Sequence, residues 1–171
     1  GCAFKKVYYD TSKRRQVSMF TPAEDIILPW GCSGIRDAER ATHVLRKSEN
    51  DLKKLQVAGF YRDVELGEPV MFHTDIEKKK AEDQGYTLTE DNRYQLFETQ
   101  IEYDLPGFES DDGIALPYIV TIDRGTNKVL GIYRNWEEPD STYLKRDHFV
   151  QYDYITGFGA YGIGYIHLIG G

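Results

Sequence analysis

The sequence has few cysteines, no metal-binding spacing and no long unbroken hydrophobic run. Its two cysteines, Cys2 and Cys32, allow at most one disulfide and do not form a metal-ligand motif. We expect both thiols to be reduced, as in an intracellular protein. The uncharged stretch 157–171 is interrupted by glycines and is too short to cross a bilayer. The sequence therefore predicts no membrane-spanning segment.

The sequence also lacks an excess of basic over acidic residues. It carries 21 Lys and Arg residues against 28 Asp and Glu residues, a formal net charge of −7, so general affinity for a nucleic acid backbone is not expected. The charge is uneven, because residues 1–15 hold five basic side chains and one acidic one, whereas residues 94–123 hold seven carboxylates and no Lys or Arg. Two interpretations stay open: solvated faces of opposite sign, or complementary patches on neighbouring subunits.

What the chain does contain is typical of a globular protein rich in β-structure. Its hydrophobic fraction is 40% and its charged fraction is 29%, as in soluble domains. A single domain of 171 residues buries about 70% of its unfolded surface. The 13 Tyr and 8 Phe residues favour sheets, where aromatic rings pack across strands.

Alternating and turn-bounded segments predict strands through most of the chain. The expected strands are residues 4–9, 17–21, 26–28, 42–46, 94–105, 118–123, 128–135 and 148–155. Residues 10–15 and 124–127 are expected to be hairpin turns. The sequence contains no βαβ alternation, which favours an antiparallel arrangement.

Two helices are predicted in the middle of the chain. Ser48 supplies an N-cap hydroxyl for a helix that ends at Gly59. Thr74 or Asp75 caps a second helix, which ends before Gly85. We therefore predict one α+β domain over residues 1–171, a mainly antiparallel sheet with two short helices in the middle of the chain.

Several patterns that could carry chemistry lack the context that the chemistry needs. Gly157, Gly159 and Gly162 match G-x-G-x-x-G, but β-favouring residues follow them, where a dinucleotide-binding loop opens a helix. We expect these glycines to bend an extended chain or to let backbones approach closely. Neither Cys32 nor Ser33 is linked by spacing to a histidine base.

The carboxylates do not form a recognisable site either. Glu109, Asp111 and Asp112 lie in a loop without the distal glutamate of a calcium-binding loop. Glu98 and Glu102 are expected on the polar outer face of a strand, together with Gln100. We predict no catalytic, cofactor-binding or metal-binding residue, and no enzyme activity.

The C-terminal stretch 157–171 is uncharged and rich in large apolar residues. Its apolar area is too large to be left in water, at about 25 cal/mol per Å². We predict that it forms a subunit-contact surface or packs against an element that continues the chain. The residues assigned to this surface are Phe158, Tyr161, Ile163, Tyr165 and Ile166.

Several segments resemble the portal proteins of short-tailed double-stranded DNA bacteriophages and related prophages. The resemblance extends over essentially the whole chain, and its most specific part is the last block. The segments are L-Q-V-A-G-F-Y-R-D (55–63), Y-D-L-P-G-F-E (103–109), L-P-Y-I-V-T-I-D (116–123), R-N-W (134–136) and H-F-V-Q-Y-D-Y-I-T-G-F-G-A-Y-G-I-G-Y-I-H-L-I-G-G (148–171). Portal proteins are several times larger, so the resemblance implies an internal piece, from the wing region.

The resemblance implies a structural role at a capsid vertex of the virion, after assembly in the host bacterial cytoplasm. The full-length subunit would form a homo-oligomeric ring, a dodecamer, that contacts terminase, scaffold or capsid proteins and a tail adaptor. Double-stranded DNA would pass through its channel during packaging and ejection without sequence-specific binding. Two other classes stay open: a module that binds carbohydrate or protein, and an enzyme domain with an unrecognised site.

Overall fold

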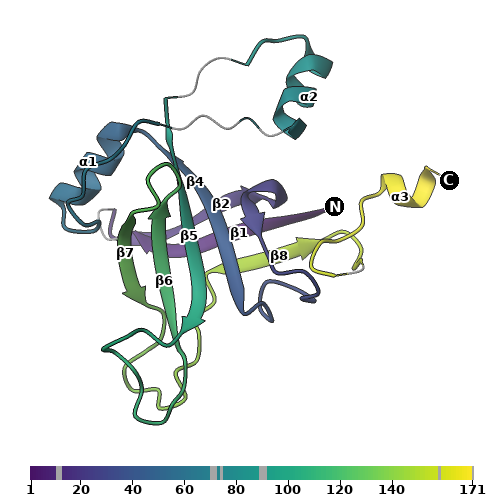
Figure 1. Ribbon diagram of the computed structural model, residues 1–171. Coiled ribbons are helices and arrows are strands. Elements are labelled where there is room, and N and C mark those ends of the chain that lie inside the picture. The colour runs from purple at the N-terminus through teal and green to yellow at the C-terminus, as the bar shows by residue number, and fades with distance from the viewer. Residues whose placement is uncertain (11–12, 70–72, 74, 89–91, 158, 171) are drawn as a thin grey trace. The chain divides into compact units, whose positions relative to one another are not determined.

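The computed structural model describes residues 1–10, 13–69, 73, 75–88, 92–157 and 159–170 (Figure 1). The chain forms an α+β fold, as the sequence predicts. Its strands are β1 (Cys2–Asp10), β2 (Arg15–Pro22), β3 (Ile26–Ile27), β4 (Arg40–Lys47), β5 (Tyr94–Tyr103), β6 (Leu116–Asp123), β7 (Val129–Arg134) and β8 (Phe149–Asp153). Its helices are the 3₁₀-helix η1 (Ala23–Asp25) and the α-helices α1 (Glu49–Val57), α2 (Asp75–Gln84) and α3 (Ile166–Ile169).

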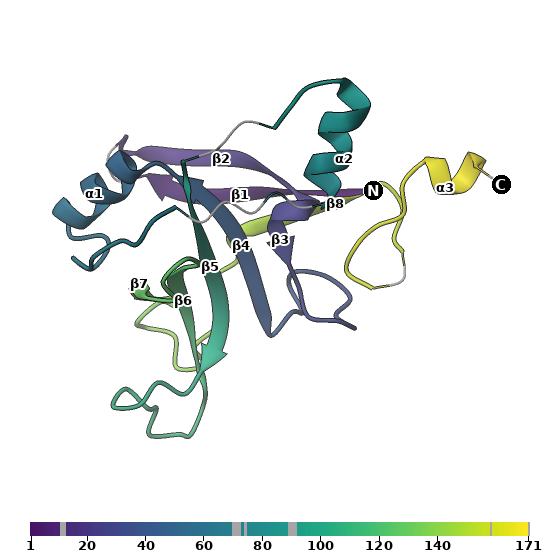
Figure 2. The same ribbon diagram turned by 45° about the horizontal axis from the view of Figure 1, so that its top comes forward.

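The strands form two antiparallel sheets. One has the order β2-β1-β8, and the other has the order β3-β4-β5-β6-β7. Figures 1 and 2 both show β1 between β2 and β8. The register pairs Lys5 with Phe20 on one side and with Val150 on the other. The N-terminal hairpin is thus extended by a strand from the C-terminal part of the chain.

The turn between β1 and β2 confirms the predicted hairpin. Asp10 is paired with Arg15 in the antiparallel register, and the Asp10 carboxylate accepts a hydrogen bond from the backbone N–H of Lys13 at 3.1 Å. Arg14 has a φ of 51°, the left-handed conformation that a tight turn requires.

The chain divides into two compact units, each with its own core. The first unit contains residues 1–44, 98–120 and 132–171, and the second contains residues 45–97 and 121–131. The core of the first unit is formed by Phe4, Ile26, Ile35, Ala41 and Phe149. The core of the second unit is formed by Leu52, Tyr61, Tyr94, Leu96 and Leu130. The single domain remains a prediction, because compactness does not show whether the units fold separately.

Local signals account for much of the second unit. The Ser48 hydroxyl accepts a hydrogen bond from the Asp51 backbone N–H at 3.2 Å, which caps α1 as predicted. Gly59 and Gly85 follow α1 and α2 with a φ of 72° each, as expected for glycines beyond a helix C-terminus. Thr74, one of the two predicted caps of α2, lies outside the described residues.

The β6–β7 turn is closed by a buried carboxylate. Asp123 is buried, and one of its carboxylate oxygens accepts hydrogen bonds from the backbone N–H and the hydroxyl of Thr126, at 3.1 and 2.6 Å. Asn127 has a φ of 56°, a left-handed backbone conformation that asparagine tolerates in tight turns. The predicted hairpin over residues 118–135 is therefore confirmed.

The predicted polar outer face of β5 is wrong for two of its three residues. Gln100 is buried, and Glu98 is part-buried in an ion pair with Lys6 of β1. Glu102 and Tyr103 are exposed. The period-2 pattern predicts the strand correctly, but the burial along β5 does not alternate, because the pattern does not say which face a distant strand covers.

The β-favouring residues after Gly164 do not form a strand in the structure. A single helical turn, α3, forms there, with the backbone N–H groups of His167 and Leu168 donating to the carbonyls of Gly164 and Tyr165 at 3.0 Å each. The preference of individual residues for β-structure is weak, and the packing around them can override it. Within the described residues, no helix is long and apolar enough to cross a membrane.

Candidate functional site

The C-terminal segment has an anchored first half. The side-chain amide of Gln151 on β8 donates to the carbonyl of Ala160 at 2.7 Å. The Tyr161 hydroxyl donates to the carbonyl of Ile26 at 2.8 Å, and the backbone of Ile163 bonds to that of Ile155 at 2.9 Å. Burial raises the pKa of Tyr161, so the phenol stays protonated and remains a donor. These bonds hold the chain up to Ile163 against the first unit.

The second half of the segment is exposed, and we call residues 165–169 the exposed tail segment. Its four large apolar side chains are between 56% and 71% exposed, namely Tyr165, Ile166, Leu168 and Ile169. Of the residues that the sequence assigned to a contact surface, Tyr161 is 43% exposed and Ile163 is half-buried. Phe158 lies outside the described residues. The contact surface itself remains a prediction.

Close backbone approach explains two of the tail glycines. A Cβ at Gly157 would lie 2.7 Å from the Tyr161 carbonyl oxygen, and one at Gly162 would lie 2.8 Å from the Ile155 carbonyl oxygen. Gly159 has a φ of 88°, which side chains rarely adopt. This confirms that the glycines bend the chain and admit neighbouring backbone. The helix that follows, α3, has four residues, too few for a dinucleotide-binding helix.

One face of the β2-β1-β8 sheet carries several exposed apolar side chains, and we call it the outer sheet face. Its exposed apolar residues are Val7, Tyr9, Phe20, Val150 and Tyr152. Register places Phe20, Lys5 and Val150 in one row across the three strands, and the Lys5 ammonium lies 5.7 Å from the centre of the Tyr152 ring. The Tyr154 ring, which follows β8, contacts Tyr165 edge-on at 5.9 Å, so the apolar surface reaches the exposed tail segment.

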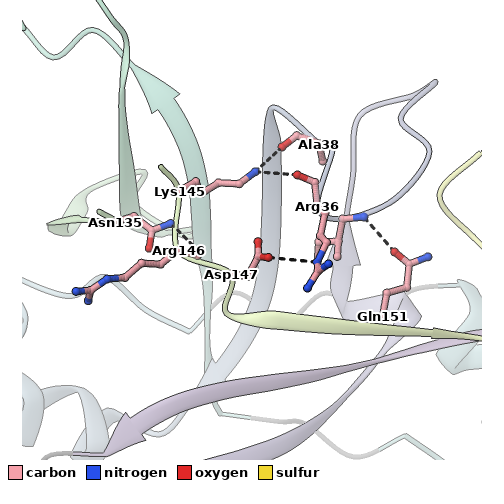
Figure 3. A network of polar contacts seen from close by, with 8 residues as sticks. Arg36, Ala38, Asn135, Lys145, Arg146, Asp147 and Gln151 are labelled. Carbon is pink, nitrogen blue, oxygen red and sulfur yellow. Dashed lines mark hydrogen bonds and ion pairs between the residues drawn. The ribbon is translucent and has the colours of Figure 1, made fainter. Parts of the chain in front are cut away.

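A polar network fastens the chain before β8 to the loop before β4 (Figure 3). The Lys145 ammonium donates to the carbonyls of Arg36 and Ala38 at 3.3 and 3.0 Å. The Arg36 guanidinium pairs with the Asp147 carboxylate at 3.2 Å, and the side-chain oxygen of Gln151 accepts from the Ile35 backbone N–H at 3.0 Å. Gln151 therefore joins this loop, β8 and the C-terminal segment.

A histidine in the first unit lies against a part-buried ion pair. His148 Nε2 is 2.7 Å from the Asn135 side-chain oxygen, and Asn135 is 1% exposed. Burial lowers the pKa of His148, the Lys6 ammonium lowers it further, and the Glu98 carboxylate opposes that effect. The Asn135 amide also donates to the Arg146 carbonyl at 3.3 Å. The lowered pKa and these hydrogen bonds favour the neutral form of the half-buried His148.

The other candidate nucleophiles and bases have local partners. The Ser33 hydroxyl donates to the Asp37 carboxylate at 2.7 Å, and the Cys32 thiol donates to the Pro29 carbonyl with a sulfur–oxygen distance of 3.1 Å. Both cysteines are free thiols. His43 packs edge-on against the Phe149 ring at 5.6 Å. The described contacts thus bring neither nucleophile to a histidine.

The loop between β5 and β6 presents carboxylates, and we call residues 104–114 the acidic loop. Both Glu109 carboxylate oxygens accept from the Gly107 backbone N–H at 2.9 Å, and this hydrogen bond is the main cause that lowers the pKa of Glu109. Asp104, Asp111 and Asp112 are exposed. In the described part of the chain, no group of three or more His, Cys, Asp or Glu side chains is arranged to hold a metal ion.

The chain matches no protein-family model and no curated protein. Sequence reasoning singled out the C-terminal segment, but it missed Gln151 and Asn135, whose partners are distant in the sequence. No local signal distinguishes these two amides from exposed ones, since both lie among residues typical of strands and turns.

Proposed function

We propose that this chain is part of the structural subunit of a bacteriophage portal ring. In that role it contributes to a conduit at a capsid vertex, through which double-stranded DNA enters and leaves. The finer features of the proposal are a dodecamer and contacts with terminase, capsid or scaffold, and tail adaptor proteins. They rest on the resemblance of the quoted segments to portal proteins.

The observation that best supports an assembly role is the exposed tail segment. It lies in block 148–171, the most specific part of the resemblance, and its side chains remain more than half exposed in this chain. Exposed apolar patches of this kind mark surfaces that other protein covers. In a ring subunit, that cover would be a neighbouring subunit or another element of the same subunit.

The charge of the chain is compatible with a conduit. A formal net charge of −7 disfavours tight binding of phosphate groups, which would retain DNA inside a channel. Hydrolysis of ATP belongs to the terminase in this assignment, so the subunit itself has no need of a nucleotide site.

The decisive experiment is electron microscopy of the full-length protein that contains this chain. We expect rings with a central channel. A monodisperse monomer at every concentration tested would reject the proposal. Co-purification of the full-length protein with a terminase large subunit gives a second readout of the same assignment.

A point variant tests the role of the exposed tail segment within the ring. Ile166→Ser removes an apolar side chain that is 71% exposed, and Leu144→Ser is a matched control because Leu144 is also 71% exposed. We expect Ile166→Ser to reduce the ring fraction in the full-length protein and Leu144→Ser to leave it unchanged. Equal ring fractions for both variants would show that the tail segment is not a contact surface.

A further inference from the structure

In the described part of the first unit, the apolar side chains of the outer sheet face remain between 38% and 64% exposed, and basic residues lie in the adjoining β1–β2 turn. Lys5 occupies the centre of the row that joins Phe20 and Val150. The β1–β2 turn adds the exposed side chains of Lys13, Arg14 and Arg15. Asp10 is the acidic residue of this hairpin, and its carboxylate pairs with Lys13 at 3.5 Å. The face is therefore apolar with Lys5 at its centre, and basic side chains lie in the turn at its end, where the register pairs Arg15 with Asp10 on the opposite side of the sheet.

The acidic loop has the opposite character. It carries Asp104, Glu109, Asp111 and Asp112 and no basic residue. Phe108 stands among these carboxylates with 65% of its surface exposed. Two turns shape the loop: Phe108 N–H donates to the Leu105 carbonyl at 2.9 Å, and Gly113 N–H donates to the Ser110 carbonyl at 3.0 Å.

Little of this opposite charge is neutralised inside the chain. Lys6 of β1 and Glu98 of β5, the strand before the acidic loop, form a part-buried ion pair. Among the described residues, no ion pair involves the guanidinium groups of Arg14 and Arg15 or the carboxylates of Asp104, Asp111 and Asp112. These charges are available to a partner, and complementary charge selects and orients partners.

We propose that the outer sheet face of one copy binds the acidic loop of a second copy. Phe108 of the loop would supply the aromatic anchor that interfaces commonly require, packed against the apolar rows around Lys5. Because the two surfaces differ, the contact is head-to-tail, and repeated contacts of this type close into a ring when the rotation permits. The inference rests on the proposed function, since it names the surfaces that would join neighbouring subunits.

Charge reversal and charge exchange test the contact directly. Arg14→Glu/Arg15→Glu and Asp111→Lys/Asp112→Lys are each expected to weaken self-association of the chain at least about tenfold. An equimolar mixture of the two variants is expected to associate again, because the reversed surfaces are complementary. Sedimentation measurements at about 50 mM and about 500 mM salt separate this effect from apolar association, since salt screens it.

Control variants and thermal melting distinguish loss of the proposed contact from general effects of charge and from misfolding. Lys78→Glu/Lys79→Glu and Glu82→Lys/Asp83→Lys make the same charge changes at exposed positions of α2, and we expect no effect on association. Phe108→Ser tests the contact without changing charge, and it should weaken association at both salt concentrations. Thermal melting of each variant identifies any that fails to fold, in which case Phe108→Ser carries the test.

The outcomes distinguish this inference from the proposed function. Rings that persist in the full-length Arg14→Glu/Arg15→Glu and Phe108→Ser variants would overturn the docking contact and leave the portal proposal standing. Absence of rings in the unmodified full-length protein would reject the portal proposal, while the exchange experiment on the chain would still decide the contact. A chain that stays monomeric at both salt concentrations, or a mixture that fails to associate, would overturn the inference. Weaker self-association on reversing Arg14 and Arg15, but not on reversing the acidic loop, would mean that the outer sheet face binds a different surface of the second copy, which also overturns the inference.

Discussion

The longest-range side-chain hydrogen bonds of the two compact units span different distances along the sequence. In the second unit, the Ser48 cap and the Asp123 turn join residues three positions apart, and the Lys128 ammonium reaches the Glu65 carbonyl across 63 positions. In the first unit, Gln151 reaches Ile35 across 116 positions, and Tyr161 reaches Ile26 across 135. The first unit therefore depends on its C-terminal segment for internal order, and the same segment also carries the exposed apolar side chains.

This difference suggests where each unit is vulnerable, and core truncations have the largest expected effect. Phe4→Ala in the first unit should cost about 3–5 kcal/mol of unfolding free energy, and Leu52→Ala in the second about 2–5 kcal/mol. Both side chains are fully buried. Both tryptophans, Trp30 and Trp136, lie in the first unit, so tryptophan fluorescence reports on that unit.

We expect Phe4→Ala to move the urea midpoint seen by tryptophan fluorescence more than the midpoint seen by far-ultraviolet circular dichroism. Leu52→Ala should reverse that order. Coincident midpoints in both variants would show one cooperative transition and would remove the energetic basis for treating the units separately.

The next largest effect is expected at the buried amide of the first unit. Asn135→Ala removes the partner of His148 and of the Arg146 carbonyl and should cost about 2 kcal/mol, since buried polar groups lose their hydrogen bonds. Asn50→Ala, at an exposed position of α1, is the matched control. Equal costs in chemical unfolding would mean that the Asn135 network does not stabilise the fold.

The helix cap of the second unit should have a smaller effect. Ser48→Ala removes the acceptor for the Asp51 backbone N–H and is expected to cost about 1 kcal/mol. Ser48→Asp keeps an acceptor at the same place and should restore most of the loss. Failure of the aspartate to recover stability in urea unfolding would argue against capping as the cause.

The smallest expected effect is a pH dependence from His148. Its pKa in the folded chain is lowered, mainly by burial, so the folded state binds fewer protons than the unfolded state. Stability should fall as the pH drops below the unfolded value of about 6.5 and should stop falling once the lowered pKa is passed. His148→Gln should lose less stability than the unmodified chain between about pH 7.5 and about pH 5.5, and an unchanged slope would contradict this.

The sequence predicts the elements well where their signals are local. Ser48, Gly59 and Gly85 mark helix ends through capping and left-handed backbone, and the β1–β2 and β6–β7 hairpins follow from turns between alternating segments. These features depend on neighbours within a few residues, so a single sequence is sufficient to find them.

The failures have a common physical origin in distant partners. The alternation of β5 does not reveal that Lys6, 92 positions away, covers the face that carries Glu98, so the burial of Gln100 was missed. Local preference gave no signal for α3, whose residues favour strands. The sequence identifies the apolar C-terminal segment as a candidate surface. It does not show that Gln151 anchors only the first half of that segment.

The position of β8 has a consequence for synthesis on the ribosome. Strand β1 is made before β8, its partner on one side, which begins at Phe149, so every residue between Asp10 and Phe149 must be synthesised before that edge is covered. Until then, the nascent hairpin presents unpaired backbone groups and an apolar flank to other nascent chains. Slowing translation ahead of the codon for Phe149 should therefore raise aggregation, and bound chaperone should accumulate on truncated products that end before this strand.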